Sequence, residues 1–130
     1  MPTPTVRFRI DFNRDEAIGP GKIALLEAIA KSGSLSQAAR DLHMSYRRAW
    51  QLLASTNTAF VDKVAETSTG GRGGGGARIT AFGHALIGSF RAFEKDVQAR
   101  AARHFRPIAG RARQTAARTK RSPVVRLSDR

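Results

Sequence analysis

Two spacings of hydrophobic residues alternate along the chain and predict its secondary structure. Val6–Phe12 carries an apolar residue at every second position, which is typical of a strand with one buried face. The pattern breaks over Asn13–Gly21, where Gly and Pro gather, and resumes at helical spacing over Lys22–Lys31. We therefore expect an N-terminal strand, whose partner lies elsewhere in the chain, and a first helix that ends near Gly33.

The next segment has the pattern of a helix-turn-helix. Ser34 is a suitable N-cap for a short helix over Leu35–Leu42, and Gln37 is placed to complete a capping box with it. After only two intervening residues, Ser45 is a second N-cap that opens a long helix reaching about Phe60. Two helices joined by so tight a turn predict this motif.

The following residues predict a wing and a further helix. Val64–Gly76 ends in a glycine-rich run and Ala77–Thr80 returns to an extended pattern, as expected of a β-hairpin with a glycine tip. Thr80 then caps a helix with an apolar stripe at intervals of three or four: Phe82, Leu86, Phe90, Phe93 and Val97. The expected fold class is mainly α with a small β component, a winged helix-turn-helix with an N-terminal strand, a β-hairpin wing and a long C-terminal helix.

Charge divides the chain into a folded domain and a tail. The 130 residues carry a formal net charge of +13, which favours a polyanionic partner, and double-stranded DNA is the first candidate. Residues 97–130 hold ten of the 23 basic residues but only one of the ten acidic residues. We expect one DNA-binding domain over 1–105 and a basic, disordered tail over 106–130, because the tail has too little apolar surface to bury.

Several other classes of protein are disfavoured by the sequence. No apolar run approaches the length of a membrane span, and the N-terminus lacks a signal-peptide core, so we expect a cytoplasmic protein with no membrane partner. The chain has no Cys, and its three His are too scattered for the common zinc motifs. We expect no enzymatic activity, no catalytic residues, no metal and no cofactor.

The third expected helix has a polar face suited to DNA. At 100° per residue, Arg47 and Gln51 lie opposite Leu53, and Trp50 lies at the boundary between the two faces. The first turns of a recognition helix meet base edges, so we expect Arg47 to read guanine and Gln51 to read adenine. A merely solvated face is the alternative for Arg47 and Arg48. The residues expected to contact the DNA backbone are Ser34, Ser45, Tyr46, Arg48, Arg72 and Arg78.

Three stretches resemble ModE-type molybdate-responsive regulators, whose winged helix-turn-helix is related to the LysR-type DNA-binding domain. They are Ser32–Gln37, Met44–Trp50, and Thr69–Ala77 with the Ile79, Thr80 and Gly83 that follow. The resemblance implies a homodimer joined through the first and last helices. The interface residues expected from it are Ile23, Leu26, Phe90, Phe93 and Val97. Closing the core of a single chain is the alternative for the last three.

The resemblance also raises the question of a ligand. Full-length members of this family continue into modules that bind molybdate, and the sequence has no room for them after the winged helix. Control by an oxyanion would therefore need a separate oxyanion-binding protein or a site that the sequence does not show. The expected function is a sequence-specific transcriptional regulator. Two alternatives remain: a nucleoid-type protein that coats DNA without sequence choice, suggested by the basic tail, and an oxyanion sensor that uses the glycine loop.

Overall fold

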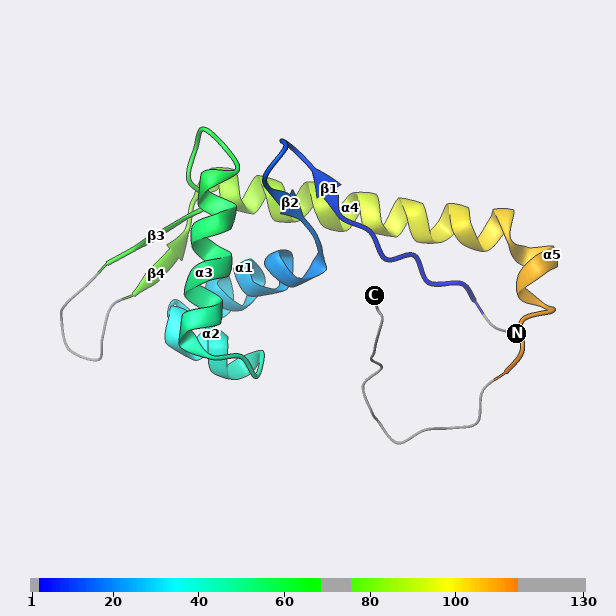
Figure 1. The fold of residues 1–130 in the computed structure, drawn as a ribbon, viewed down its shortest axis with the longest axis horizontal. Coiled ribbons are helices and arrows are strands. Elements are labelled where there is room, and N and C mark those ends of the chain that lie inside the picture. The colour runs from blue at the N-terminus through cyan, green and yellow to red at the C-terminus, as the bar shows by residue number, and fades with distance from the viewer. Residues whose placement is uncertain (1–2, 69–75, 115–130) are drawn as a thin grey trace.

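The computed structural model describes residues 3–68 and 76–114. A helix-turn-helix body carries two short hairpins, and one long helix extends away from it (Figure 1). The elements are β1 (Ile10–Asp11), β2 (Ala17–Ile18), α1 (Pro20–Ser32), α2 (Leu35–Asp41), α3 (Tyr46–Thr58), β3 (Ala65–Thr67), β4 (Ala77–Ile79), α4 (Ala81–His104) and α5 (Arg106–Ala109). The mainly helical fold with small antiparallel hairpins confirms the expected fold class.

The core lies where α1 packs against α2 and α3. Ile23, Leu26 and Ile29 of α1 are fully buried, and they meet small residues such as Ala38 of α2 and Ala49 of α3. The small side chains let the helix backbones approach closely, which the tight connection between α2 and α3 requires. The expected helix-turn-helix is therefore formed by α2 and α3 and held in place by α1.

The expected N-terminal strand over Val6–Phe12 is wrong in its length. Only Ile10–Asp11 is a strand, and it pairs with β2 in a local hairpin in which Ile10 lies opposite Ile18. The residues before it run beside α4 (Figure 1), where the Phe8 ring stacks on the Phe90 ring at a centroid distance of 4.9 Å. The alternating pattern thus arises because one face of this extended segment packs on α4, while only two of its residues pair in a sheet.

The wing hairpin is joined to the helix-turn-helix body at its base. β3 and β4 pair antiparallel, and the Ala77 N–H donates a 3.0 Å hydrogen bond to the Gly33 carbonyl at the end of α1. Thr80 caps α4 as predicted, because its hydroxyl oxygen accepts from the Gly83 N–H at 3.0 Å. The two wing strands are confirmed, whereas residues 69–75, most of the glycine tip, lie outside the described residues.

The last described elements are α4 and α5. α4 has 24 residues, and its second half extends beyond the helix-turn-helix body (Figure 1). The first residues of the expected tail form the helical turn of α5, in which the Phe105 carbonyl accepts from the Ala109 N–H, so this short part is helical. Residues 115–130 lie outside the described residues. Among the described helices, none combines the length and the apolar character needed to cross a bilayer.

Candidate nucleic-acid interface

The start of α3 is fixed by the turn before it. His43 adopts a φ of +57°, a conformation in which His is enriched among non-glycine residues, and the Met44 N–H donates to the Ala39 carbonyl at 3.0 Å. The Ser45 hydroxyl oxygen then accepts from the Arg48 N–H at 3.0 Å, which confirms Ser45 as the N-cap. The first turn of α3 is therefore defined directly after α2.

The two faces of α3 separate as predicted. Leu53 and Thr56 are buried, and the Thr56 hydroxyl is satisfied by donating to the Leu52 carbonyl at 2.7 Å. On the opposite side, Arg47 and Gln51 are exposed. The side of the helix that the sequence pattern assigns to the core is thus packed away, and the Arg and Gln side is open to a partner.

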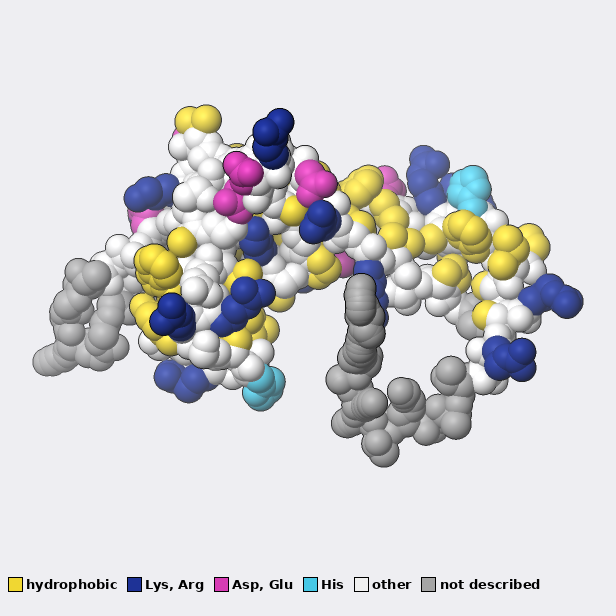
Figure 2. All heavy atoms as spheres, in the orientation of Figure 1, with side chains coloured by type: hydrophobic (Ala, Val, Ile, Leu, Met, Phe, Trp, Pro, Cys, Tyr) yellow, Lys and Arg dark blue, Asp and Glu magenta, His cyan; other side chains and the backbone are white. Residues whose placement is uncertain are grey.

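The exposed face combines basic, amide and aromatic groups. Tyr46, Arg47, Trp50 and Gln51 line one shallow hollow on α3, and the two aromatic side chains are 54% and 55% exposed. In the described residues, Arg47 forms no ion pair. Figure 2 shows Lys or Arg and hydrophobic side chains next to one another over the first half of α3. The guanidinium and the aromatic rings are therefore available together.

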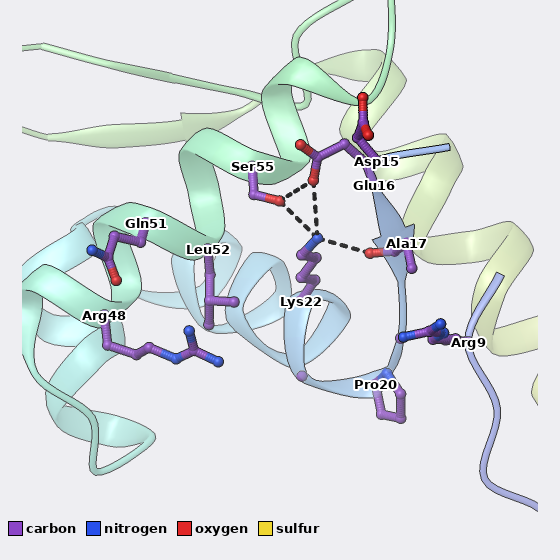
Figure 3. A pocket seen from close by; sticks show the side chains of 12 residues that line it. Arg9, Asp15, Glu16, Ala17, Pro20, Lys22, Arg48, Gln51, Leu52 and Ser55 are labelled. Carbon is purple, nitrogen blue, oxygen red and sulfur yellow. Dashed lines mark hydrogen bonds and ion pairs between the residues drawn. The ribbon is translucent and has the colours of Figure 1, made fainter. Parts of the chain in front are cut away.

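Arg48 lies on the flank of this face. It lines a second hollow with Gln51, bounded by the start of α1 and the β1–β2 hairpin, and in Figure 3 its side chain extends toward α1. Arg9 contributes a further basic side chain to the opposite wall of the hollow. Two basic side chains beside the reading face suit contacts with phosphate groups, because such contacts position a protein on the duplex.

A network centred on Lys22 fixes the orientation of α3. The Lys22 ammonium donates at 2.8 Å to the Ser55 hydroxyl on α3 and at 2.8 Å to the Ala17 carbonyl in β2, and it lies 3.7 Å from the Glu16 carboxylate (Figure 3). The Ser55 hydroxyl in turn donates to Glu16. One ammonium therefore ties α1, α3 and the N-terminal hairpin together.

The Glu16 carboxylate in this network is kept charged. Its pKa lies below the usual value chiefly because the Ser55 hydroxyl donates to it, and the Thr58 hydroxyl and Lys22 act in the same direction, while burial opposes them. The sequence pattern does not reveal that Lys22 and Glu16 hold α3 in position, because it indicates only that a helix begins at Lys22. A basic residue entering α1 directly after an acidic hairpin is the signal that was available.

Asn57 joins α3 to the wing. Its side-chain oxygen accepts from the Val64 N–H at 2.7 Å and from the Ala65 N–H at 3.3 Å, and its amide donates to the Ala65 carbonyl at 3.2 Å. Both backbone partners belong to fully buried residues at the start of β3. The wing is thus held at a defined position relative to the exposed face of α3.

The two expected wing arginines differ in what the structure describes. Arg78 in β4 is exposed and pairs with Glu66 across the hairpin, an ion pair whose side chains are 73% and 54% exposed. So exposed a pair contributes little to stability, and a phosphate can compete for the guanidinium. Arg72 lies outside the described residues.

Ser34 caps α2, but the expected capping box is not complete. The Ser34 hydroxyl oxygen accepts from the Gln37 N–H at 3.0 Å, as predicted. The Gln37 side chain contacts Arg40 and Asp41 instead of returning to Ser34, whose N–H donates to the Ser32 hydroxyl at 3.2 Å. The hydroxyls of Ser34 and Ser45 use only an acceptor position as caps, so each keeps a donor for another partner.

The five expected interface residues occupy different environments. Ile23 and Leu26 have no exposed surface, and 3% of the Phe90 surface is exposed. These three residues belong to the core of the single chain, where a second copy cannot contact them directly. Phe93 is 47% exposed, and Val97 is partly exposed on the projecting part of α4. The surface that a second copy could reach is therefore confined to Phe93 and Val97 among the five.

Residues 21–84 match the model of a family described as bacterial regulatory helix-turn-helix protein, lysR family. This match extends from α1 through the wing to the beginning of α4. It therefore includes α2, α3 and the exposed face described above.

Three relatives share this part of the sequence. The chain is 43% identical over 77 residues to molybdenum-pterin-binding protein MopA of Rhodobacter capsulatus, which covers 59% of the chain and 29% of that protein. It is 46% identical over 68 residues to DNA-binding transcriptional dual regulator ModE of Escherichia coli (strain K12), covering 52% and 26%. It is 33% identical over 92 residues to molybdenum transport protein ModE of Azotobacter vinelandii, covering 71% and 34%. The matched part spans about a quarter to a third of each relative's length.

Proposed function

We propose that the chain is a homodimeric, sequence-specific DNA-binding regulator of transcription. The match of residues 21–84 to the LysR-family helix-turn-helix model and the sequence similarity to ModE support this proposal. The observation that carries the proposal is the exposed side of α3, which offers a guanidinium and an amide on a rigid helix. A binding role of this kind requires no catalytic residue and no cofactor. Its DNA partner would place the protein in the cytoplasm.

Arg47 and Gln51 are the proposed base-reading residues. A guanidinium donates two parallel hydrogen bonds to guanine, one to O6 and one to N7. A side-chain amide donates from its NH₂ group to adenine N7 and accepts with its oxygen from the adenine N6 amino group. Both side chains lie within the first two turns of α3, the part of a recognition helix that enters the major groove. Their roles follow from this position and from their exposure.

The proposed backbone contacts surround the reading face. Arg48 lies on one flank, the Ser45 and Ser34 hydroxyls mark the starts of α3 and α2, and the Tyr46 hydroxyl lies in the first turn of α3. Such donors set the register of a protein on the duplex without reading sequence. On the wing, Arg78 would exchange its carboxylate partner for a phosphate, and we propose the same type of contact for Arg72.

We propose that a second copy packs on the projecting half of α4. Phe93 keeps nearly half of its surface exposed although its ring already meets the Phe8 ring at 5.3 Å. A partner helix covering Phe93 and Val97 would bury this surface and place two reading faces on one duplex. The interface proposed here is narrower than the five residues expected from the sequence.

The effector and the tail are further parts of the proposal. Two relatives carry molybdenum in their names. By analogy with these relatives, we propose a separate oxyanion-binding protein as a partner of this chain. The domain would end near residue 105, and the basic residues beyond it would add phosphate contacts that raise affinity for any sequence.

Selection of binding sites from random duplexes tests the proposed function. The purified full chain should enrich one near-palindromic sequence whose half-sites lie about one helical turn apart. Binding without any enriched sequence would contradict the proposal and favour the nucleoid-type alternative, to which the basic tail points. Calorimetry of the full chain with molybdate alone tests the oxyanion-sensor alternative, and measurable binding would contradict the separate effector protein.

A further inference from the structure

Two large aromatic side chains on α3 are not used by the protein's own core. Tyr46 and Trp50 are both more than half exposed. Other exposed aromatic residues, such as Phe12 and Phe93, pair with a second ring at centroid distances of 5.1 and 5.3 Å. Within residues 3–68 and 76–114, no ring pair includes Tyr46 or Trp50. Their apolar surface is therefore available to a partner.

Trp50 lies among the residues proposed to read bases. It follows Arg47 by three positions and precedes Gln51 by one, so its side chain belongs to the same exposed side of α3. The three residues share one hollow with Tyr46. A large apolar surface thus lies between two hydrogen-bonding groups on the face that would enter the major groove.

The major groove presents little apolar surface to such a side chain. Base edges display hydrogen-bond donors and acceptors, and the one apolar substituent among them is the C5-methyl group of thymine. An indole ring has a single N–H donor and is otherwise apolar, so covering it with a methyl group is favourable, whereas covering it with polar groups alone is not. Tyr46 has a hydroxyl and lies in the first turn, which suits the phosphate contact proposed above.

We propose that Trp50 recognises thymine in the operator through the C5-methyl group. This inference rests on the proposed function, because it requires α3 to lie in the major groove. The face would then read three different base edges by three chemistries: Arg47 reads guanine, Gln51 reads adenine and Trp50 reads the thymine methyl. Trp50 is a specificity-determining residue in addition to the two that the helical pattern indicates.

Replacing thymine by deoxyuracil tests this directly, since the replacement removes the methyl group and keeps every hydrogen-bonding group of the base. Each thymine of the selected operator is replaced in turn, and affinity for the full chain is measured by titration. At one position per half-site the affinity should fall about fourfold, the effect of burying one methyl-sized group (about 0.8 kcal/mol). Replacement in both half-sites should lower it about 15-fold.

Variants of the protein assign this discrimination to one residue. Trp50→Ala should bind the thymine and deoxyuracil operators equally at that position, and Trp50→Gln, which keeps a long side chain, should behave in the same way if Trp50→Ala does not fold. Val61→Ala is the matched control, because Val61 is a fully exposed apolar residue outside α3. It should keep the whole difference between the two operators.

The outcomes separate the inference from the proposed function. If the wild type binds its selected operator but tolerates deoxyuracil at every position, or if the Trp50 variants keep the discrimination, Trp50 does not read thymine while the proposed function stands. If selection enriches no sequence at all, the proposed function fails and the thymine contact fails with it.

Discussion

Gly83 marks the point where α4 presses against the base of the wing, and replacing it should loosen this junction. A Cβ at Gly83 would lie 2.1 Å from the Val64 carbonyl oxygen and 2.7 Å from the Ile79 Cγ2 atom. Non-bonded contacts of this kind normally lie at about 3.5 to 4.0 Å, so the backbone must move by roughly 1 Å or more. We expect Gly83→Ala to lower the free energy of unfolding by about 1 to 3 kcal/mol, the usual cost of overpacking.

Gly88 provides a matched control in the same helix, because, apart from the adjacent turns of α4, no atom of the described residues lies within 4 Å of a Cβ built there. Gly88→Ala should therefore raise the free energy of unfolding by up to about 1 kcal/mol through helix propensity alone. Thermal unfolding followed by circular dichroism measures both variants, with about 4 to 8 °C in Tm for each kcal/mol. Equal Tm values for Gly83→Ala and Gly88→Ala would refute the close packing of α4 on the wing.

Three further predictions concern pH, the tail and the interface. The two hydrogen bonds from Arg91 hold the pKa of Glu27 below its usual 4.5 against the effect of burial, so the stability they add is present above that pH and is lost as pH falls through the lowered value. Thermal unfolding of Glu27→Gln should accordingly show a smaller loss of stability between about pH 5 and 3 than the wild type, and identical pH profiles would disprove this. Removing residues 115–130 should weaken binding to all duplexes alike. Because five basic residues are lost, the slope of log affinity against log salt concentration should become shallower by at most about 4 to 5. A changed base preference in the shortened chain would argue against a non-specific arm. Phe93→Glu should convert the proposed dimer to monomers in sedimentation experiments without lowering Tm by more than a few degrees. A dimer that this substitution leaves intact would exclude this part of α4 as the interface.

The sequence predicts the helix-turn-helix well because local rules determine it. The caps at Ser45 and Thr80 and the left-handed end of α1 at Gly33, with φ +72°, each depend on a few neighbouring residues. The buried and exposed sides of α3 follow from its period, and the structure agrees. These features need no knowledge of distant contacts.

Features that depend on distant contacts could not be predicted in the same way. The alternation in Val6–Phe12 reports one buried face but cannot tell a strand partner from α4. Likewise, the apolar spacing of Ile23 and Phe93 is the same whether the residue fills the core or remains exposed, and only the structure separates them. Lys22 and Asn57 position α3 through partners far along the chain or in the wing, which no periodicity reveals.

Trp50 lies at the boundary of the two faces in the helical pattern of α3, about 60° from Arg47. The same spacing puts it about 100° from Ala49 on the buried side, so the angle alone leaves its burial open. Its 55% exposure shows that it belongs to the exposed side. A large apolar residue on a polar helix face is therefore a signal that the sequence offered and that the structure makes usable.

The central claim is that the exposed side of α3 reads DNA sequence, and the base preference of Arg47→Ala tests it most directly. With all four base pairs placed at each operator position, the variant should lose about 1 to 3 kcal/mol on the preferred guanine and become indifferent at that one position. Lys95→Ala, which removes the same charge from an exposed position on α4, should keep the full preference. If Arg47→Ala kept the preference of the wild type at every position, this face of α3 would not be the one that reads DNA.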